Sequence, residues 1–264
     1  MQGSANLTIM INAARKAGRS LVKDFREIEN LQVSSKAAGD FVTRADIASE
    51  RIIRDMLMEA RPNYGWLGEE SEPVAGKDPT RRWIVDPLDG TTNFLHGLPH
   101  WAVSIALEFK GEIVAAVVFD PAKDELFVAE KGAGTFMNDR RLRVSNRGVM
   151  MDCLFATGIP FATKRTLPAM MHDLAQLMPA SSGMRRWGAA SLDLAYVAAG
   201  RFDGFWEREL RPWDIAAGLL LVREAGGFTA PLREGESILE RGEVIAANAE
   251  IFENLARVLR TRPN

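Results

Sequence analysis

The feature that most restricts the fold of this chain is the stretch Trp83–Phe94, in which a short apolar run ends at two aspartates. A run of this kind is typical of a buried strand. Pro87 fixes its own φ and pushes Asp86 into an extended conformation, so we expect a turn there. Gly90 lets the backbone approach a ligand, and a short helix that receives a phosphate could begin just after it. Two acids beside a phosphate require a cation between them, which predicts a metal site with oxygen ligands.

The overall composition excludes several classes of protein. Lysine and arginine number 33 against 35 acids, a net charge of -2, so no basic field indicates direct binding of nucleic acid. The single cysteine, Cys153, excludes an internal disulfide and a multi-cysteine zinc site, and it fits a reducing compartment. No apolar run approaches the ~20 residues that cross a bilayer, and the amino end has no signal-peptide core. We therefore expect a soluble, cytoplasmic protein that binds no membrane.

The first half of the sequence predicts two helices and a series of short strands. Helical spacing of apolar residues predicts helices over 7–28 and 45–60, and Thr43–Asp46 has the spacing of a capping box before the second. Short apolar runs predict strands over 31–36, 41–43, 64–67, 103–108, 113–119 and 125–129. The polar segment 72–81 is typical of a loop. Strands in such close succession favour a largely antiparallel sheet.

The second half alternates strands with helices, which predicts a layered α/β arrangement. The expected strands are 154–157, 184–187, 202–206 and 244–247, and the expected helices are 167–177, 189–199, 212–225 and 251–259. We therefore divide the chain into an N-terminal lobe, 1–145, and a C-terminal α/β lobe, 146–264. The first lobe carries the antiparallel sheet and the metal-binding motifs, and the second completes the active site within one compact unit.

Acidic residues lie at the ends of several predicted elements: Glu69, Glu70, Asp86, Asp89 and Asp214. If the fold gathers them, two carboxylates ~4 Å apart repel by on the order of 4 kcal/mol at an effective dielectric of ~20. Divalent cations would cancel that cost. Ligand sets made of carboxylate and carbonyl oxygens select Mg²⁺ or Mn²⁺ over zinc.

Each acid also has a structural explanation that needs no metal. A pair such as Glu69 and Glu70 is more often a solvated turn, and the two aspartates around Pro87 could be turn formers. Asp46 could simply complete the capping box of Thr43. Asp214 follows a proline just inside a helix start, where an acid complements the helix dipole. Taken one at a time, these explanations mostly prevail, and the order of the motifs along the chain decides between them.

That order resembles the inositol monophosphatase family, the Mg²⁺-dependent, lithium-sensitive phosphomonoesterases. The stretches that carry the resemblance are Gly68–Ser71, Trp83–Phe94 and Pro212–Gly218, together with Asp40–Asp46, Gly188–Ala195 and Glu224–Gly227. They are long and specific, and the match covers nearly the whole chain. Leu192–Asp203 and Leu210–Gly227 are most similar to the bacterial branch of the family.

The resemblance implies an α+β layered sandwich, the αβαβα sugar-phosphatase fold, in a protein that is usually a homodimer. It implies two or three Mg²⁺ ions, which Mn²⁺ can replace. By motif position the metal ligands are Glu69, Asp86, the carbonyl of Leu88, Asp89 and Asp214, with Glu70 as an outer ligand through water. Substrate contacts fall by the same reasoning at Leu88, Asp89, Gly90, Thr91, Arg185, Ala190, Glu207 and Asp214, where Glu207 matches the acid that contacts the ring hydroxyls.

The activity implied by the resemblance is hydrolysis of myo-inositol 1-phosphate by direct attack of a water molecule, with no phosphoenzyme. Glu69, Thr91 and Asp46 are the implied catalytic residues, because Asp46 orients Thr91 and helps to draw off the proton. Fructose-1,6-bisphosphatase, histidinol-phosphate phosphatase and 3′-phosphoadenosine nucleotidase activities are the alternatives within the fold. The short loop 71–82 argues against the nucleotidase, and Glu207 favours a polyol.

A different class of hypothesis is a binding role with the transcription machinery, in which the phosphatase site is secondary. The basic groups at 140–143 and 185–186 leave room for an acidic protein partner.

Overall fold

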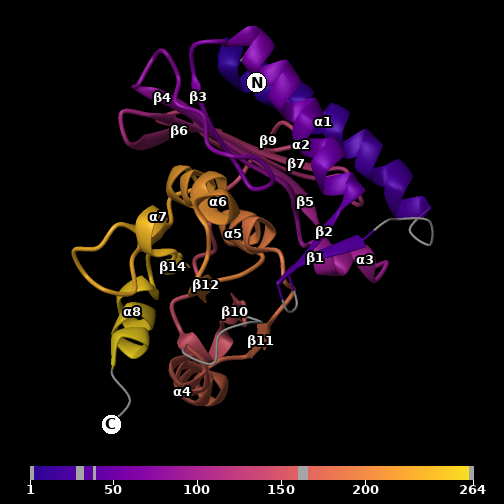
Figure 1. Cartoon of the computed structure of the whole chain (residues 1–264). Helices are drawn as coiled ribbons and strands as arrows, with labels where there is room; N and C mark the ends of the chain where they lie inside the picture. The colour runs from indigo at the N-terminus through magenta and orange to yellow at the C-terminus, as the bar shows by residue number, and fades with distance from the viewer. Residues whose placement is uncertain (1–2, 28–32, 38–39, 160–165, 262–264) are drawn as a thin grey trace.

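The structure, a computed structural model, describes residues 3–27, 33–37, 40–159 and 166–261. Its elements form five layers that follow one another from the top to the bottom of Figure 1: helices, a sheet, helices, a second sheet and helices. Three hydrophobic clusters fill the spaces between these layers. The αβαβα arrangement expected from the sequence is therefore confirmed.

The first sheet has seven strands within the described residues, in the order β3-β4-β5-β6-β7-β8-β9. β3 is parallel to β4, and the following pairs are antiparallel, as expected for this half. The strands are β3 (Gly65–Gly68), β4 (Arg81–Asp89), β5 (Ala102–Phe109), β6 (Glu112–Asp120), β7 (Glu125–Glu130), β8 (Gly134–Met137) and β9 (Arg140–Arg141). Lys110 and Gly111 both have positive φ and join β5 to β6 in a tight hairpin.

Helices α1 (Ala5–Arg26) and α2 (Arg44–Ala60) cover the outer face of this sheet. α1 begins at Ser4, whose hydroxyl accepts the N–H of Leu7. The hairpin of β1 (Val33–Ala37) and β2 (Asp40–Thr43) leads into α2. Thr43 accepts the N–H groups of Ala45 and Asp46, and Asp46 accepts the N–H of Thr43 in return, so the predicted capping box is confirmed.

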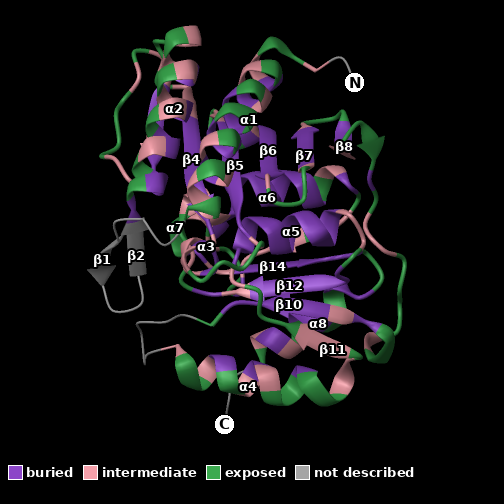
Figure 2. Ribbon diagram, turned by 90° about the vertical axis from the view of Figure 1, so that its right-hand side faces the viewer, coloured by how far each residue is buried: buried purple, intermediate pink, exposed green. Residues whose placement is uncertain are grey.

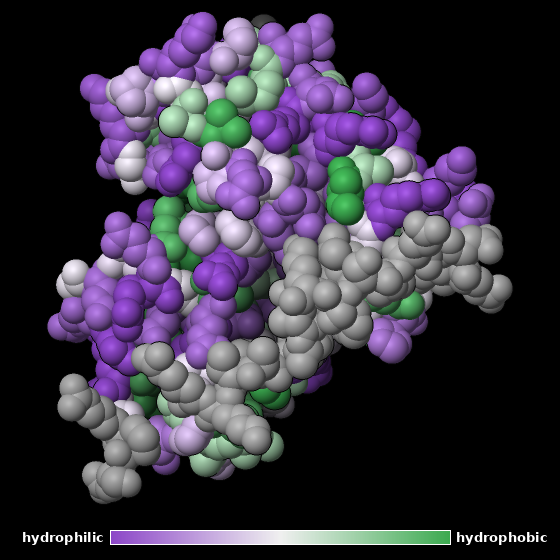
Figure 3. Space-filling view, viewed as in Figure 1, coloured by the Kyte–Doolittle hydropathy of each residue, from purple (hydrophilic) through white to green (hydrophobic). Residues whose placement is uncertain are grey.

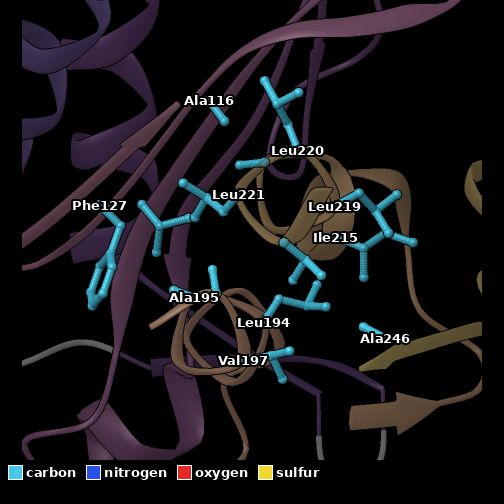
Figure 4. Close-up of a cluster of buried hydrophobic side chains, with 14 of the residues drawn as sticks. Ala116, Phe127, Leu194, Ala195, Val197, Ile215, Leu219, Leu220, Leu221 and Ala246 are labelled. Atoms are coloured by element: carbon cyan, nitrogen blue, oxygen red, sulfur yellow. The ribbon is translucent and has the colours of Figure 1, made fainter. Parts of the chain in front are cut away.

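The middle layer consists of α5 (Ala190–Ala198) and α6 (Pro212–Glu224), which lie between the two sheets (Figure 2). Both helices are apolar almost all round because sheets cover both of their faces. Figure 4 shows side chains of α5 and α6 packing on each other and on the first sheet at Ala116 and Phe127, with Ala246 of the second sheet on their other side. A Cβ on Gly218 of α6 would lie 2.5 Å from Leu194, so this glycine permits the close approach of the helices.

The second sheet is mixed and has the order β11-β10-β12-β14-β13. Its strands are β10 (Leu154–Thr157), β11 (Gly183–Arg185), β12 (Gly204–Glu207), β13 (Phe228–Ala230) and β14 (Val244–Ala247). Helices α4 (Leu167–Leu177) and α8 (Phe252–Arg260) cover its outer face through a cluster that includes Phe155, Trp206 and Leu255. Two short α-helices, α3 (Thr91–Leu95) and α7 (Ile238–Arg241), and two 3-10 helices, η2 (Met150–Asp152) and η3 (Met178–Ala180), complete the described elements.

Most elements expected from the sequence are present, with ends that differ by one or two residues. The strands β8, β9 and β13 and the helix α7 were not predicted, because segments of two to four residues are too short to show a period. The expected first helix ends at Arg26, while residue 28 and part of the strand expected over 31–36 lie outside the described residues.

The expected turn at Pro87 is wrong. β4 continues through Pro87 to Asp89, and its register with β5 shifts between Asp86 and Asp89. A bulge of this kind accepts a proline inside a strand, because the residues within it make no regular ladder hydrogen bonds. The bulge therefore keeps both aspartates on the same strand.

The surface seen in Figure 3 is mostly hydrophilic, with small and separate apolar areas. Among the described residues, no helix is both long and apolar enough to cross a membrane.

Candidate active site

One face of α2 holds the surrounding loops in place through three polar side chains. Asp46, Ser49 and Glu50 are all buried and lie at the i, i+3 and i+4 positions of the helix. The Ser49 hydroxyl donates to the carbonyl of Pro87 (2.8 Å), inside the bulge of β4. Glu50 accepts the backbone N–H of Glu70 (2.8 Å), just after β3. A single helix face therefore positions both acidic motifs.

Asp46 divides its two carboxylate oxygens between two tasks. One oxygen accepts the backbone N–H and the hydroxyl of Thr43 and completes the helix cap. The other accepts the hydroxyl of Thr91 (3.0 Å). That hydroxyl also lies 3.0 Å from the carbonyl oxygen of Leu88. It has one proton for two acceptors, so the two contacts compete for it.

Three of the acids come from two neighbouring strands: Asp86 and Asp89 lie in β4, and Glu69 directly follows β3. The parallel pairing of these strands is extended by the N–H of Glu69, which donates to the carbonyl of Val85 (3.2 Å), beside Asp86. Asp86 accepts the N–H of Leu88 (2.9 Å) through one oxygen. The Leu88 side chain is buried in the outer core. Its carbonyl oxygen belongs to the backbone of the bulge and lies 3.0 Å from the Thr91 hydroxyl.

Asp89 and Asp214 are held at the beginnings of the two middle helices. One oxygen of Asp89 accepts both the N–H (2.8 Å) and the hydroxyl (2.5 Å) of Ser191 in the first turn of α5. One oxygen of Asp214 accepts the N–H of Arg211 (2.7 Å) at the start of α6. Donors of this kind at a helix start favour the ionised form of a carboxylate.

The charges of these acids act on one another. Burial raises the pKa of Asp86 well above its ordinary value, and the charges of Glu69, Asp89 and Asp214 raise it further. Burial and the charges of Asp89 and Glu69 also raise the pKa of Asp214. The pKa of Asp89 is raised by burial to about 6, even though Ser191 favours its ionised form. Acids that repel one another in a buried region either take up protons or are compensated by a cation.

These residues fit a hard divalent cation, because the donors are carboxylate and carbonyl oxygens. Within the described part of the chain, however, no three acidic, histidine or cysteine side chains converge as closely as the ligands of a bound metal. Like charges keep such oxygens apart. The predicted ligand set therefore stays a prediction: Glu69, Asp86, Leu88, Asp89 and Asp214. It is supported by the effect of the acids' charges on one another's pKa values.

The phosphate-binding turn expected at Gly90 has a backbone that other residues would strain. Gly90 has φ of +92° and begins α3, and a Cβ there would lie 3.0 Å from the carbonyl oxygen of His100. The carboxamide of Asn93 donates to the carbonyls of His100 (2.8 Å) and Trp187 (2.7 Å). It thereby connects α3 to the segment that precedes α5.

The substrate contacts expected in the second half fall into two groups. Ala190 is buried in the first turn of α5, and its N–H favours ionisation of Asp89, so it lies beside the acids. Arg185 is exposed at the edge strand β11, and its guanidinium donates to the carbonyl of Met184. Its neighbour Arg186 is instead the arginine whose charge acts on Glu207. Arg185 as a substrate contact stays a prediction without a described contact to the other site residues.

Glu207 lies at the end of β12, next to the region of the acids. Burial raises its pKa to about 8, and the charges of Asp214 and Asp89 contribute. A Cβ on Gly158 would lie 1.7 Å from a carboxylate oxygen of Glu207, so the glycine leaves the space that this carboxylate occupies.

Sequence reasoning missed the polar residues that orient the expected ones. Ser49, Glu50, Asn93 and Ser191 are all buried and polar. The sequence of α2 did contain a signal for a polar, buried helix face, because Asp46, Ser49 and Glu50 recur at helical spacing among apolar residues. The partner of Ser191, Asp89, lies 102 positions away and has no signature in local sequence.

The raised pKa of Glu207 predicts how stability depends on pH in the presence of a chelator. The folded-state pKa of about 8 lies above the ordinary value of 4.5, so the contribution of Glu207 is complete below pH 4.5 and is lost as the pH rises to 8. The melting temperature of Glu207→Gln is expected to fall less between pH 5.5 and 8 than that of the wild type. Thermal scans across this range measure the difference. Glu253→Gln, at an exposed position of α8, serves as the control and should match the wild type.

The comparisons with known proteins identify the family of this chain. A family model described as the inositol monophosphatase family matches residues 4–263. The inositol-1-monophosphatase of Rhizobium meliloti is 55% identical over 98% of this chain and 97% of its own length. A solved structure of the extragenic suppressor protein suhB from Bartonella henselae has a TM-score of 0.95 and 53% identity, and the match covers 98% of this chain and 100% of that one. The Nus factor SuhB of Escherichia coli is 42% identical over 96% of this chain and 95% of its own.

Proposed function

The chain belongs to the inositol monophosphatase family, and from this premise we propose that it hydrolyses myo-inositol 1-phosphate to inositol and phosphate. Family membership makes it a phosphoric monoester hydrolase. The observation that carries the proposal is that Asp86 and Asp89 are buried and that the charges of Glu69, Asp89 and Asp214 all raise the pKa of Asp86. These acids repel a negatively charged substrate such as a phosphate. They can therefore take part in binding it only when cations are also present.

The cations that we propose are Mg²⁺, two or three in number, with Mn²⁺ as a substitute and with sensitivity to lithium. The residues that would hold them are Glu69, Asp86, Asp89 and Asp214, together with the carbonyl of Leu88. When bound, such ions supply a polarised water and stabilise the charge that develops on the leaving oxygen. Glu70, whose N–H is fixed by Glu50, would contribute an outer ligand through water.

Thr91, Asp46 and Glu69 are the side chains that would act on the attacking water molecule. When the Leu88 carbonyl binds a cation, Asp46 is the remaining acceptor for the Thr91 proton, and the oxygen of that hydroxyl can accept a hydrogen bond from a water molecule. Burial raises the pKa of Asp46, which makes this carboxylate a better proton acceptor than an exposed aspartate. Together with Glu69, these two residues would orient the water and receive its proton. The water attacks phosphorus directly, and no phosphoenzyme forms.

The remaining residues hold the substrate. We propose that Gly90 and Thr91 contact the phosphate, because the glycine backbone allows a close approach. Ala190 and Asp214 would line the centre of the site, and Glu207 would accept hydrogen bonds from ring hydroxyls. This arrangement favours a polyol monophosphate over fructose 1,6-bisphosphate, histidinol phosphate or a 3′-phosphonucleotide.

The test is phosphate release from a panel of sugar and polyol phosphates, with Mg²⁺, with Mg²⁺ and Li⁺, and with a chelator. We expect inositol 1-phosphate to have the highest kcat/KM, by roughly tenfold over the alternatives, since each lost polar contact costs about this factor. Lithium should inhibit, and the chelator should stop turnover. Undiminished turnover in the chelator would contradict the metal site, and a preference for a bisphosphate would contradict the substrate.

A second candidate function rests on the names of several relatives. Proteins named Nus factor SuhB are 42–44% identical to this chain, compared with 50–55% for proteins named inositol-1-monophosphatase. A binding role with the transcription machinery therefore ranks second. Capture of transcription proteins by an inactive Asp89→Asn variant would favour it, and loss of the biological effect in that variant would favour the enzyme.

We also propose that the protein is a cytoplasmic homodimer that binds no nucleic acid directly. The net charge of -2 and the single, buried cysteine support this proposal. Light scattering of the purified protein gives the oligomeric state.

A further inference from the structure

Asn93 is a buried polar residue whose side chain connects three segments of the chain. It lies in α3, and 8% of its surface is exposed. Its carboxamide nitrogen donates to the carbonyl of His100 (2.8 Å) and to the carbonyl of Trp187 (2.7 Å). A carboxamide has two N–H donors, so both of them are used. The acceptors lie 7 and 94 positions away, in segments without regular secondary structure, so these hydrogen bonds fix backbone that no helix or strand holds.

The two segments that accept these hydrogen bonds also contact each other. The rings of His100 and Trp187 meet edge to face, with their centroids 4.9 Å apart. The ring of Trp187 also contacts Tyr196 of α5, at a centroid distance of 5.8 Å. Asn93 therefore completes a junction in which hydrogen bonds to the backbone and contacts between rings hold the same residues.

The phosphate-binding turn proposed at Gly90 lies against this junction. A Cβ on Gly90 would lie 3.0 Å from the carbonyl oxygen of His100 and 3.3 Å from the Cβ of Ala189. The His100 carbonyl is therefore both an acceptor for Asn93 and a neighbour of the turn. The Gly90 carbonyl accepts the N–H of Phe94 (3.0 Å), which fixes Asn93 one turn of helix away from Gly90. A displacement of Asn93 would displace the turn with it.

We propose that Asn93 is a positioning residue for the phosphate, which holds the turn at Gly90 and Thr91 against the segment that leads into α5. This inference rests on the proposed function, because it assumes that the turn contacts the phosphate. Asn93 itself does not touch the substrate. Its effect is therefore the same for every phosphomonoester, whatever alcohol carries the phosphate, whereas Glu207 would act on a polyol alone.

The experiment compares the wild type with Asn93→Leu, which has a similar size and no donor. The inhibition constant of inorganic phosphate, a product of the reaction, is expected to rise roughly fivefold to tenfold, the effect of one weakened hydrogen bond to the phosphate. The value of kcat/KM should fall roughly tenfold to a hundredfold, because a small misplacement of the reacting groups is enough for such a loss. Inositol 1-phosphate and p-nitrophenyl phosphate should lose the same factor.

Asn248→Leu is the matched control for the loss of a buried carboxamide. Asn248 is fully buried, and its carboxamide donates to the hydroxyl of Ser145 (2.8 Å) and the carbonyl of Arg147 (3.1 Å). It follows β14, at the opposite end of β12 from Glu207. The control should lower the melting temperature, as Asn93→Leu does, because buried hydrogen bonds are lost in both. It should leave the inhibition constant of phosphate and kcat/KM unchanged.

A double-mutant cycle with Thr91→Val tests whether Asn93 acts through the turn. Two residues that act through the same group have effects that do not add. In the Thr91→Val background, Asn93→Leu should therefore lower kcat by a smaller factor than in the wild type. It should still raise the inhibition constant of phosphate, because the backbone at Gly90 is displaced in both backgrounds.

Four results would each overturn the proposal. They are a folded Asn93→Leu protein with an unchanged inhibition constant of phosphate, a loss confined to inositol 1-phosphate, an equal loss of activity in Asn248→Leu, and additive effects on kcat in the cycle. If either leucine variant does not fold, both are replaced by serine, which is smaller and has one donor where asparagine has two.

The same measurements separate this proposal from the proposed function. A wild type that hydrolyses p-nitrophenyl phosphate but not inositol 1-phosphate would overturn the substrate, while the other phosphoester and inorganic phosphate still test Asn93. A wild type that hydrolyses neither would overturn the proposed function. Calorimetric titration with inorganic phosphate and Mg²⁺ would then test Asn93 by the same rise of roughly fivefold to tenfold, in the dissociation constant. A wild type that binds no phosphate would overturn both.

Discussion

Replacement of Asp89 by asparagine is expected to lower kcat by about a hundredfold to a thousandfold while the protein stays folded. This is the size of effect seen when a single group that stabilises transition-state charge is removed. Asp89 is 8% exposed and is anchored at the start of α5 by Ser191, so the asparagine occupies the same place. What changes is its negative charge, which we propose to be part of the metal site. Steady-state phosphate release and circular dichroism provide the two measurements.

The thermal response to Mg²⁺ distinguishes loss of a metal ligand from general damage. A cation that binds only the folded state raises the melting temperature. The wild type is expected to show this rise, and Asp89→Asn is expected to show a smaller one. Asp120→Asn is the matched control, because Asp120 is also buried but pairs with Lys123 outside the site. It should lose stability and keep its activity. An active or an unfolded Asp89→Asn protein would contradict the proposed role.

Replacement of Thr91 by valine is expected to lower kcat by roughly a hundredfold with little change in KM. The valine keeps the shape of the side chain and removes the hydroxyl that joins Asp46 to the Leu88 carbonyl. General acid–base groups typically contribute about 10² to 10⁴ to the rate, and the loss of one orienting partner falls at the lower end. Thr92→Val, the same change one position later, should retain full activity.

Asp46→Asn should cause a loss similar to that of Thr91→Val, and the double variant should be little worse than either single variant, because the two residues act as a unit. Asp46 also caps α2, so a control for the cap is needed. Thr43→Ala should cost about 1 kcal/mol of stability through the cap and lower kcat far less than Asp46→Asn, because the backbone N–H of residue 43 still holds the carboxylate. Additive losses at Asp46 and Thr91 would show that they work independently.

The elements that could be predicted from the sequence are those whose causes are local. Apolar periodicity located α1 and α2, and the spacing of Thr43 and Asp46 located the start of the second helix. The missed strands β8, β9 and β13 are short, and their residues are fixed by pairing with neighbours rather than by a pattern of their own. The continuation of β4 through Pro87 depends in the same way on a bulge against β5.

The motifs of the candidate site could be predicted from the sequence, but most of the contacts between their side chains could not. Asp46 was correctly assigned to the cap of its helix, where its partner is three residues away. Its second partner, Thr91, is 45 positions away. The sequence resemblance implied that link, and no local pattern expressed it. The burial of Asp193 had no signal in the sequence either, because it results from the packing of α5 between the two sheets.

The sequence by itself determined most of the helices and strands, the family and the identity of the acids, because these follow from neighbouring residues and from the order of motifs. Only the tertiary structure decided which acids repel one another, which helix face holds the acidic motifs and which of two adjacent arginines lowers the pKa of Glu207. The physical reason is the separation along the chain over which each effect acts. Propensity and capping act over a few residues, whereas burial and charge act between whatever groups the packed layers bring together.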